Sequence, residues 1–188
     1  MPSKIFTQKI RKLESSLMRD SQKLAQLKRR SPRELVEDYT LDGPTGPVNL
    51  STLFGKKDDL IVIHNMGAGC RYCTMWADGF NGVYPHLADR AAFVVVSPDL
   101  PKAQKKFAHG RGWRFPMVSC AGTPFCKDLG FQGRDGCKPG ISTFQRKGKK
   151  IYRVASAGLG PFDLFCSVWH IIALLADGVN DWSPQYKY

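Results

Sequence analysis

The sequence lacks the features that would place it in several large classes of protein. No apolar run approaches the ~20 residues that span a membrane, so we expect no transmembrane helix. The opening residues MPSKIFTQKIRK contain no apolar segment of a secretory signal, and the expected location is therefore cytoplasmic. Neither a GxGxxG motif nor a phosphate-binding loop occurs, so we expect no bound organic cofactor.

Acidic residues are also in short supply. Asp and Glu number 16 against 28 Lys and Arg, which gives the 188-residue chain a formal net charge of +12. Such a charge can favour acidic partners. The basic residues are spread along the chain, however, and do not cluster with aromatic side chains as they do on surfaces that stack nucleic-acid bases. Nucleic-acid binding is therefore not the expected function.

An amphipathic helix is predicted at the start of the chain, over residues 5–30. Its apolar side chains recur at steps of three and four residues, at Ile10, Leu13, Leu17, Leu24 and Leu27. We assign residues 1–34 to this basic helix and its linker, and residues 35–188 to one domain. We expect the helix to pack on its own domain or on a second copy of the chain, as in a homo-oligomer; an arm for membrane surfaces or nucleic acid is the alternative.

The remainder of the chain alternates predicted strands and helices. We expect a hairpin and a helical turn over 39–54, strands over 60–63 and 91–98, helices over 83–90, 101–109 and 123–130, a short extended segment over 115–119, a loop over 133–140, a hairpin of strands 141–146 and 150–154, and a closing helix over 162–176. This order describes an α/β domain. Its central sheet is expected to be mixed but mostly parallel, flanked by helices, with a late antiparallel edge.

The stretch LIVIHNMGAGCRYCTMWADGF, from Leu60 to Phe80, combines a buried strand with two closely spaced cysteines. A loop of small residues that ends at Gly69 leads to Cys70 and Cys73, and a helix can begin there. The unpaired N–H groups and the dipole at a helix N-terminus favour an anion such as a thiolate. Cys70 should therefore ionise easily, with Arg71 adding positive charge, and Cys73 lies one turn away, where it can close a disulfide.

Other readings of the cysteines stay open. Cys70 and Cys73 could be half of a zinc site, but no second CxxC occurs, and the distant Cys166 and His170 would have to complete it. We expect no metal. Three further cysteines flank a loop that could approach the site: Cys120, Cys126 and Cys137. One of them could resolve a disulfide there; the alternative is that they are buried apolar residues, as isolated cysteines more often are.

Three neighbouring side chains also have two readings each. Tyr72 could line a substrate groove or simply pack. Trp76 could shield the disulfide from water or belong to the core. His64 is expected to be a hydrogen-bonded core histidine rather than a base.

The chain resembles a bacterial thioredoxin-like family of predicted dithiol–disulfide oxidoreductases with no defined function. The similarity runs from about residue 10 to the C-terminus and is carried by LFGKKDDLIVIHNMGAGCRYCTMWADGFNGVYPHL, AAFVVVSPD, GWRFPMVS and PGISTFQRKGKKI. This resemblance implies a thioredoxin-like fold with the N-terminal helix as an extension. It strengthens the expectation of the fold more than that of the function.

The sequence departs from related patterns at two places. Thioredoxins carry a cis-proline before the strand that faces the CxxC, and the resemblance places Ser142 there. Peroxiredoxins carry Thr or Ser three residues before the attacking cysteine and Pro seven before it, where this chain has Gly67 and Ile63. A conventional peroxidase site is therefore not expected.

The leading hypothesis is a thiol–disulfide oxidoreductase whose only redox group is the Cys70–Cys73 disulfide. The Cys70 thiolate would attack a protein or small-molecule disulfide, Cys73 would release the reduced product, and a cellular thiol reductant would supply electrons. The alternative is a non-catalytic thioredoxin-like binding protein or redox sensor. A CxxC that binds metal is the weaker possibility.

Overall fold

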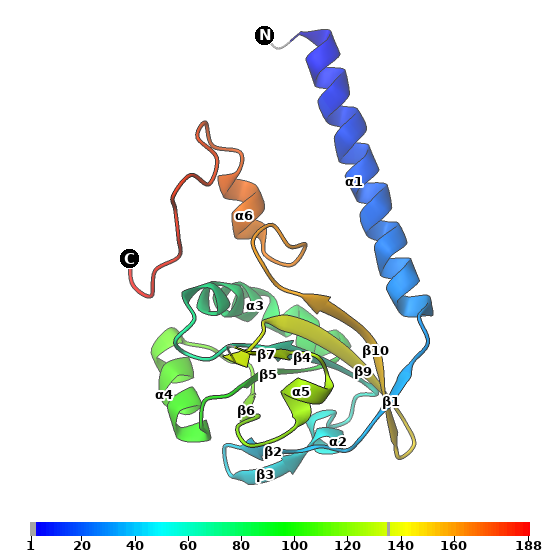
Figure 1. Ribbon diagram of the computed structural model, residues 1–188, viewed down its shortest axis with the longest axis vertical. Helices are drawn as coiled ribbons and strands as arrows, with labels where there is room; N and C mark the ends of the chain where they lie inside the picture. The colour runs from blue at the N-terminus through cyan, green and yellow to red at the C-terminus, as the bar shows by residue number, and fades with distance from the viewer. Residues whose placement is uncertain (1–2, 135) are drawn as a thin grey trace.

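The computed structural model describes residues 3–134 and 136–188 (Figure 1). Its helices are α1 (Lys4–Arg30), α2 (Leu50–Leu53), α3 (Arg71–Arg90), α4 (Pro101–Arg111), α5 (Phe125–Asp128) and α6 (Ser167–Ile172). Its strands are β1 (Glu34–Val36), β2 (Thr40–Gly43), β3 (Gly46–Asn49), β4 (Asp59–His64), β5 (Ala92–Ser97), β6 (Met117–Ser119), β7 (Gln132–Gly133), β8 (Gly136–Cys137), β9 (Gly140–Lys147) and β10 (Lys150–Gly158). The segment 133–140, predicted as a loop, contains the end of β7, all of β8 and the start of β9, and residue 135 within it lies outside the described residues.

The main sheet has eight strands in the order β1-β10-β9-β4-β5-β6-β2-β3, while β7 and β8 form a separate small ladder. The predicted mixed sheet flanked by helices is confirmed. The expected predominance of parallel pairs is wrong, because only β4–β5 and β5–β6 are parallel among the described pairs of this sheet. The hairpins at each end pair antiparallel because their short turns reverse the chain.

The sheet is buried on both faces, as the apolar runs of its central strands predict. Val62, Val94 and Val96 face a core closed by α2 and α5. The alternate residues Ile63 and Val95 face a second core beneath α3. The parallel strands β4 and β5 at the centre of the sheet therefore contribute side chains to both cores.

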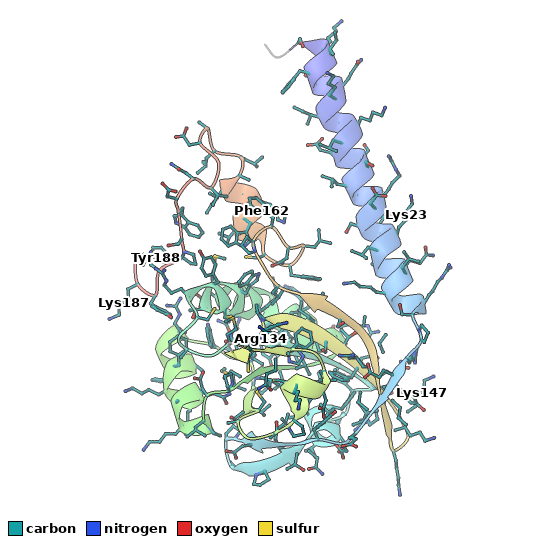
Figure 2. The ribbon with its side chains drawn as sticks, viewed as in Figure 1. Lys23, Arg134, Lys147, Phe162, Lys187 and Tyr188 are labelled. Carbon is teal, nitrogen blue, oxygen red and sulfur yellow. The ribbon has the colours of Figure 1, made fainter. Side chains whose placement is uncertain are left out.

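Helix α1 confirms the predicted N-terminal helix and projects away from the rest of the molecule (Figure 1). None of its described residues is buried. Its apolar stripe, including Leu13 and Leu17, is exposed, and its side chains extend around the helix axis near the labelled Lys23 (Figure 2). Packing of this stripe on the chain's own domain is therefore not observed. Among the described residues, no helix combines the length and apolarity needed to cross a membrane.

Helix α3 is longer than predicted. The segment 83–90, expected as a separate short helix, continues the helix that starts at Arg71. Pro85 inside it leaves the carbonyl of Asn81 without its usual helical donor. Nη2 of Arg114 donates to that carbonyl oxygen at 3.2 Å, so a side chain from outside the helix replaces the lost bond.

The closing helix is shorter than predicted. The apolar pattern over 162–176 predicts one helix, but α6 spans only Ser167–Ile172. Phe162 has a left-handed φ of 64°, and the Asp163 carboxylate accepts hydrogen bonds from the backbone N–H groups of Gly160 and Phe165 at 3.0 and 2.6 Å. These bonds give the backbone a turn in place of the first helical residues.

Candidate functional site

The loop over residues 65–69 lies at the edge of the sheet where the parallel strands β4 and β5 end. The side chain of Asn65 accepts from the N–H of Gly67 at 2.7 Å, and the Asp99 carboxylate accepts from the N–H of Ala68 at 2.8 Å. Gly67 has a φ of 101°, and a Cβ there would lie 3.0 Å from both Asp99 carboxylate oxygens. The loop thus requires glycine at this position and delivers the chain to α3 in one conformation.

Cys70 is the N-cap of α3. Its sulfur accepts a hydrogen bond from the backbone N–H of Cys73 at 3.1 Å. The pKa of Cys70 is lowered to about 6, mainly by the hydrogen bond from the Cys73 thiol and further by the backbone N–H groups of Cys73 and Tyr72, while partial burial opposes the shift. A half-buried sulfur that is ionised at neutral pH is a nucleophile.

Cys73 has the opposite character. Its side chain is 3% exposed. Its hydrogen bond to Cys70 and its burial raise its pKa well above the ordinary range. One thiol of the pair therefore keeps its proton and stabilises the thiolate of the other.

The predicted neighbours of the pair fall into two groups: an exposed rim formed by Gly69 and Arg71, and the packed aromatic side chains of Tyr72 and Trp76. Gly69 and Arg71 are exposed beside Cys70. Nη1 of Arg71 donates to the side chain of Gln185 at 3.3 Å, and this guanidinium is not among the groups that shift the pKa of Cys70. The electrostatic role expected of Arg71 therefore has no support in this arrangement.

Tyr72 and Trp76 belong to an aromatic cluster. The Tyr72 ring stacks on Trp169 with the centroids 5.9 Å apart. Trp76 is buried, and its indole N–H donates to Asp163 at 2.9 Å. Both side chains thus anchor α3 to the C-terminal segment, residues 163–188.

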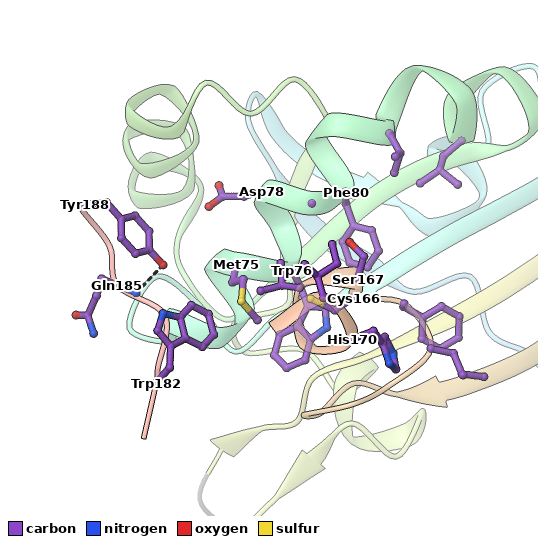
Figure 3. A pocket seen from close by; sticks show the side chains of 17 residues that line it. Met75, Trp76, Asp78, Phe80, Cys166, Ser167, His170, Trp182, Gln185 and Tyr188 are labelled. Atoms are coloured by element: carbon purple, nitrogen blue, oxygen red, sulfur yellow. Dashed lines mark hydrogen bonds between the residues drawn. The ribbon is translucent and has the colours of Figure 1, made fainter. Parts of the chain in front are cut away.

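That segment also forms one wall of an apolar hollow of about 640 Å³ (Figure 3). The other wall comes from α3 and includes Met75 and Phe80. Neither Cys70 nor Cys73 is among the residues that line it.

Ser142 does not line the entrance to the cysteine pair. It lies in β9 opposite Val62, is fully buried, and bonds Nε2 of His64 at 2.9 Å. The expectation that it occupies the substrate-facing place of the thioredoxin proline is therefore wrong, and the proline nearest the start of β9 is Pro139, directly before it. Among the described residues, no peptide bond is cis.

His64 matches the prediction of a core histidine. It stacks on Phe131 with the ring centroids 3.8 Å apart. Burial is the main cause that lowers its pKa to about 3, so it stays neutral at physiological pH.

Of the remaining cysteines, Cys166 is buried at the N-cap of α6, and the other three lie together. The sulfurs of Cys120, Cys126 and Cys137 lie within 4.8 Å of one another, and they form the only such metal-ligand group among the described residues. Cys70, Cys73, Cys166 and His170, the alternative zinc ligands, do not form such a group among the described residues.

Sequence reasoning missed Asn65 and Asp99, which hold the loop. A signal was available for Asp99. It follows β5 directly, and the carboxyl ends of neighbouring parallel strands meet at one edge of a sheet, which is where ligand sites of α/β folds lie.

Solved structures similar to this one include peroxiredoxins. Peroxidoxin BcpB from Mycobacterium tuberculosis is 26% identical with a TM-score of 0.56, covering 67% of this chain and 84% of that chain. Peroxiredoxin Q from Xanthomonas campestris is 20% identical with a TM-score of 0.55, covering 64% and 80%. A peroxiredoxin-like protein from Aquifex aeolicus is 16% identical with a TM-score of 0.56, covering 68% and 75%.

These similarities establish the fold, and the likeness to peroxidoxin BcpB supports, at a coarse level, a thiol-based redox function. Comparison with curated proteins gives no match. Residues 7–188 match the family described as "Bacterial protein of unknown function (DUF899)". The chain therefore belongs to the DUF899 family, and its fold is that of the thioredoxin superfamily.

Proposed function

We propose that the protein is a thiol–disulfide oxidoreductase whose reacting groups are Cys70 and Cys73. The observation that carries this proposal is the asymmetry of the pair: a half-buried Cys70 with a pKa of about 6 accepts a hydrogen bond from a buried Cys73 that keeps its proton. The same asymmetry separates an attacking thiol from a resolving thiol.

The reaction balances over two exchanges. The Cys70 thiolate attacks one sulfur of the substrate disulfide, the substrate S–S bond breaks, and the leaving thiolate takes a proton from water. Cys73 then loses its proton and attacks the Cys70 sulfur, which releases the second substrate thiol and leaves a Cys70–Cys73 disulfide. Two electrons pass to the substrate, and a cellular thiol reductant in the cytoplasm, the proposed location, restores the dithiol.

The exposed rim sets which substrates can approach. Gly69 and Arg71 flank the sulfur of Cys70 at the surface, and a Cβ at Gly69 would meet no atom within 4 Å. A protein disulfide on a flexible segment or a small-molecule disulfide can therefore reach this edge of α3.

Reduction of insulin disulfides tests this proposal. Cys70→Ser should lose activity entirely, since no thiolate remains to attack. Cys166→Ser is the matched control, because it also removes a buried thiol, at the N-cap of α6, and Cys166 is not among the groups that shift the pKa of Cys70 or Cys73. Full activity in Cys70→Ser would overturn the proposal, because another group would then carry the reaction. A wild-type protein that reduces no insulin disulfide would instead favour a binding protein with an idle CxxC.

Peroxide reduction is the second candidate, favoured by the likeness to peroxiredoxins. Attack of the Cys70 thiolate on the O–O bond would give a sulfenic acid and an alcohol or water, and Cys73 would condense with it to form the disulfide and release water. Gly67 offers no hydroxyl where peroxiredoxins carry Thr or Ser. We therefore expect peroxide consumption to be slower than disulfide reduction, and the reverse order would make peroxide the preferred substrate.

We also propose that α1 pairs with a second copy of the chain. Its large apolar side chains are exposed along one helix, and a stripe of that length is characteristic of an interaction surface. Replacing Leu13 and Leu17 by Lys should then convert a dimer into a monomer in light scattering without altering the thermal melting of the domain. A wild-type protein that is monomeric at micromolar concentration would contradict this.

A further inference from the structure

Three cysteines outside the proposed redox pair meet at one point of the structure. Cys120 follows β6, Cys126 lies in α5 and Cys137 ends β8. All three sulfurs are within 4.8 Å of one another, and the Cys126 thiol lies 3.0 Å from the Cys120 sulfur. Segments from three parts of the chain thus supply one sulfur each.

The backbone holds each cysteine in place. The N–H of Cys120 donates to the Ser97 carbonyl at 3.0 Å, which ties the loop after β6 to the end of β5. The carbonyl of Cys126 accepts from the N–H of Phe131 at 2.7 Å. Cys137 pairs with Gln132 in the small ladder of β7 and β8. The positions of the sulfurs are therefore set by structure that does not depend on bonds among them.

The cluster is closed on one side and open on the other. Cys120 and Cys126 are buried in the core, whereas Cys137 is partly exposed. A hollow of about 420 Å³ is lined by all three cysteines and by Met66. Small molecules or ions can therefore reach the sulfurs from this side.

The number of sulfurs distinguishes two chemical uses of the cluster. A disulfide between Cys120 and Cys126 needs two sulfurs and leaves the Cys137 thiol unexplained. A metal ion uses all three: thiolates select soft cations such as Cu⁺ and Zn²⁺. In a tetrahedral zinc site with Zn–S bonds of about 2.3 Å, the sulfurs lie about 3.8 Å apart, a spacing that this cluster can reach by small side-chain rotations.

We propose that Cys120, Cys126 and Cys137 form a binding site for one thiophilic metal ion, distinct from the Cys70–Cys73 pair. Three thiolates complete a trigonal site for Cu⁺. For Zn²⁺ they leave a fourth position facing the hollow, which a water molecule or an external thiol can fill. Binding displaces the thiol protons to solvent, and no electron transfer is involved.

The test is metal titration of the full-length protein, purified under reducing conditions without chelators. Zn²⁺ is titrated against a chromogenic chelator and Cu⁺ against bicinchoninate, and Co²⁺ serves as a spectroscopic probe for thiolate ligation. We expect one ion per chain with thiolate-to-cobalt charge-transfer absorption. Tight binding of either Zn²⁺ or Cu⁺ supports the site, and the two titrations show which ion it prefers.

Two variants and two controls assign the ligands. Cys137→Ser, at the partly exposed position, should weaken binding at least about tenfold and remove the charge-transfer absorption while preserving the fold. Cys126→Ser tests the same site from α5. The Cys70→Ser/Cys73→Ser double variant and Cys166→Ser should bind as the wild type does.

Three outcomes would overturn the proposal. One is unchanged affinity in Cys137→Ser, and another is loss of the metal only in the Cys70→Ser/Cys73→Ser variant. The third is a Cys120–Cys126 disulfide that persists in a reducing glutathione buffer, detected by mass spectrometry as the loss of two hydrogens. None of these results depends on disulfide reductase activity, so the metal site and the proposed function are tested separately.

Discussion

The two groups of cysteines in this protein show how position gives one residue type two chemical characters. Cys70 caps a 20-residue helix, is half-buried, and receives hydrogen bonds from a protonated neighbour and from backbone N–H groups. Cys120 and Cys126 are buried around a four-residue helix, and a third sulfur approaches from a different segment. The first arrangement favours exchange of a bond, whereas the second favours holding an ion.

The largest difference between the two groups should appear when the resolving thiol is removed. In Cys73→Ser the mixed disulfide at Cys70 cannot be resolved internally, so turnover should fall by about 100-fold or more. The trapped adduct would be identified by mass spectrometry. Cys137→Ser is the matched change in the other group and should keep wild-type turnover; an adduct trapped there would show that both groups belong to one relay.

The second-largest effect is expected in the rates at which the two groups of cysteines react with iodoacetamide. With a pKa of about 6, Cys70 is mostly thiolate at pH 7, about 30-fold more than a cysteine of ordinary pKa near 8.5. Because the pKa is lowered, the rate should rise through pH 6 and level off above pH 7. Peptide mapping after limited alkylation provides the measurement, and first labelling at Cys120 or Cys126 would reverse the comparison.

The loop over 65–69, which leads from β4 to the Cys70–Cys73 pair, should be sensitive to substitution at one glycine and tolerant at another. Gly67→Ala forces a side chain into a left-handed conformation against Asp99, which should reduce the free energy of unfolding by about 1–2 kcal/mol. Gly69→Ala is the control, since a Cβ there meets nothing within 4 Å. Urea unfolding would measure both, and equal effects would show that the loop is not held by Asp99.

The smallest effect is expected at Arg71. Its guanidinium bonds Gln185 at 3.3 Å and is exposed, and an exposed charge contributes less than about 1 kcal/mol. Arg71→Gln should therefore leave the pH midpoint of Cys70 alkylation within about 0.5 unit of the wild type. A larger upward shift would restore the charge-based account of the Cys70 thiolate.

Local patterns predicted the elements whose cause is local. The alternating steps of leucine predicted α1, and the apolar run before the loop predicted β4. The cysteine pair was expected at a helix N-terminus, and Cys70 is the N-cap of α3. The apolar spacing over 162–176 predicted too long a helix at α6, because the Asp163 carboxylate competes for the backbone N–H groups that would begin it.

Contacts between distant segments could not be read from the sequence. Ser142 in β9 forms a hydrogen bond with His64 in the neighbouring strand β4, although the two residues are 78 positions apart in the sequence. Ser142 is therefore buried and does not face a substrate. Cys137 joins Cys120 only because the ladder of β7 and β8 folds back. The positions of these residues in the sequence do not predict either contact.

The sequence by itself determined where the central strands, the N-terminal helix and the Cys70–Cys73 pair lie, because hydrophobic periodicity and helix capping act over a few residues. Only the tertiary structure decided which sulfurs meet, which polar side chains are buried and which hydrogen bonds lower the pKa of Cys70. Those outcomes depend on the register of strands that pair across most of the chain, and register is fixed by the packing of the whole sheet.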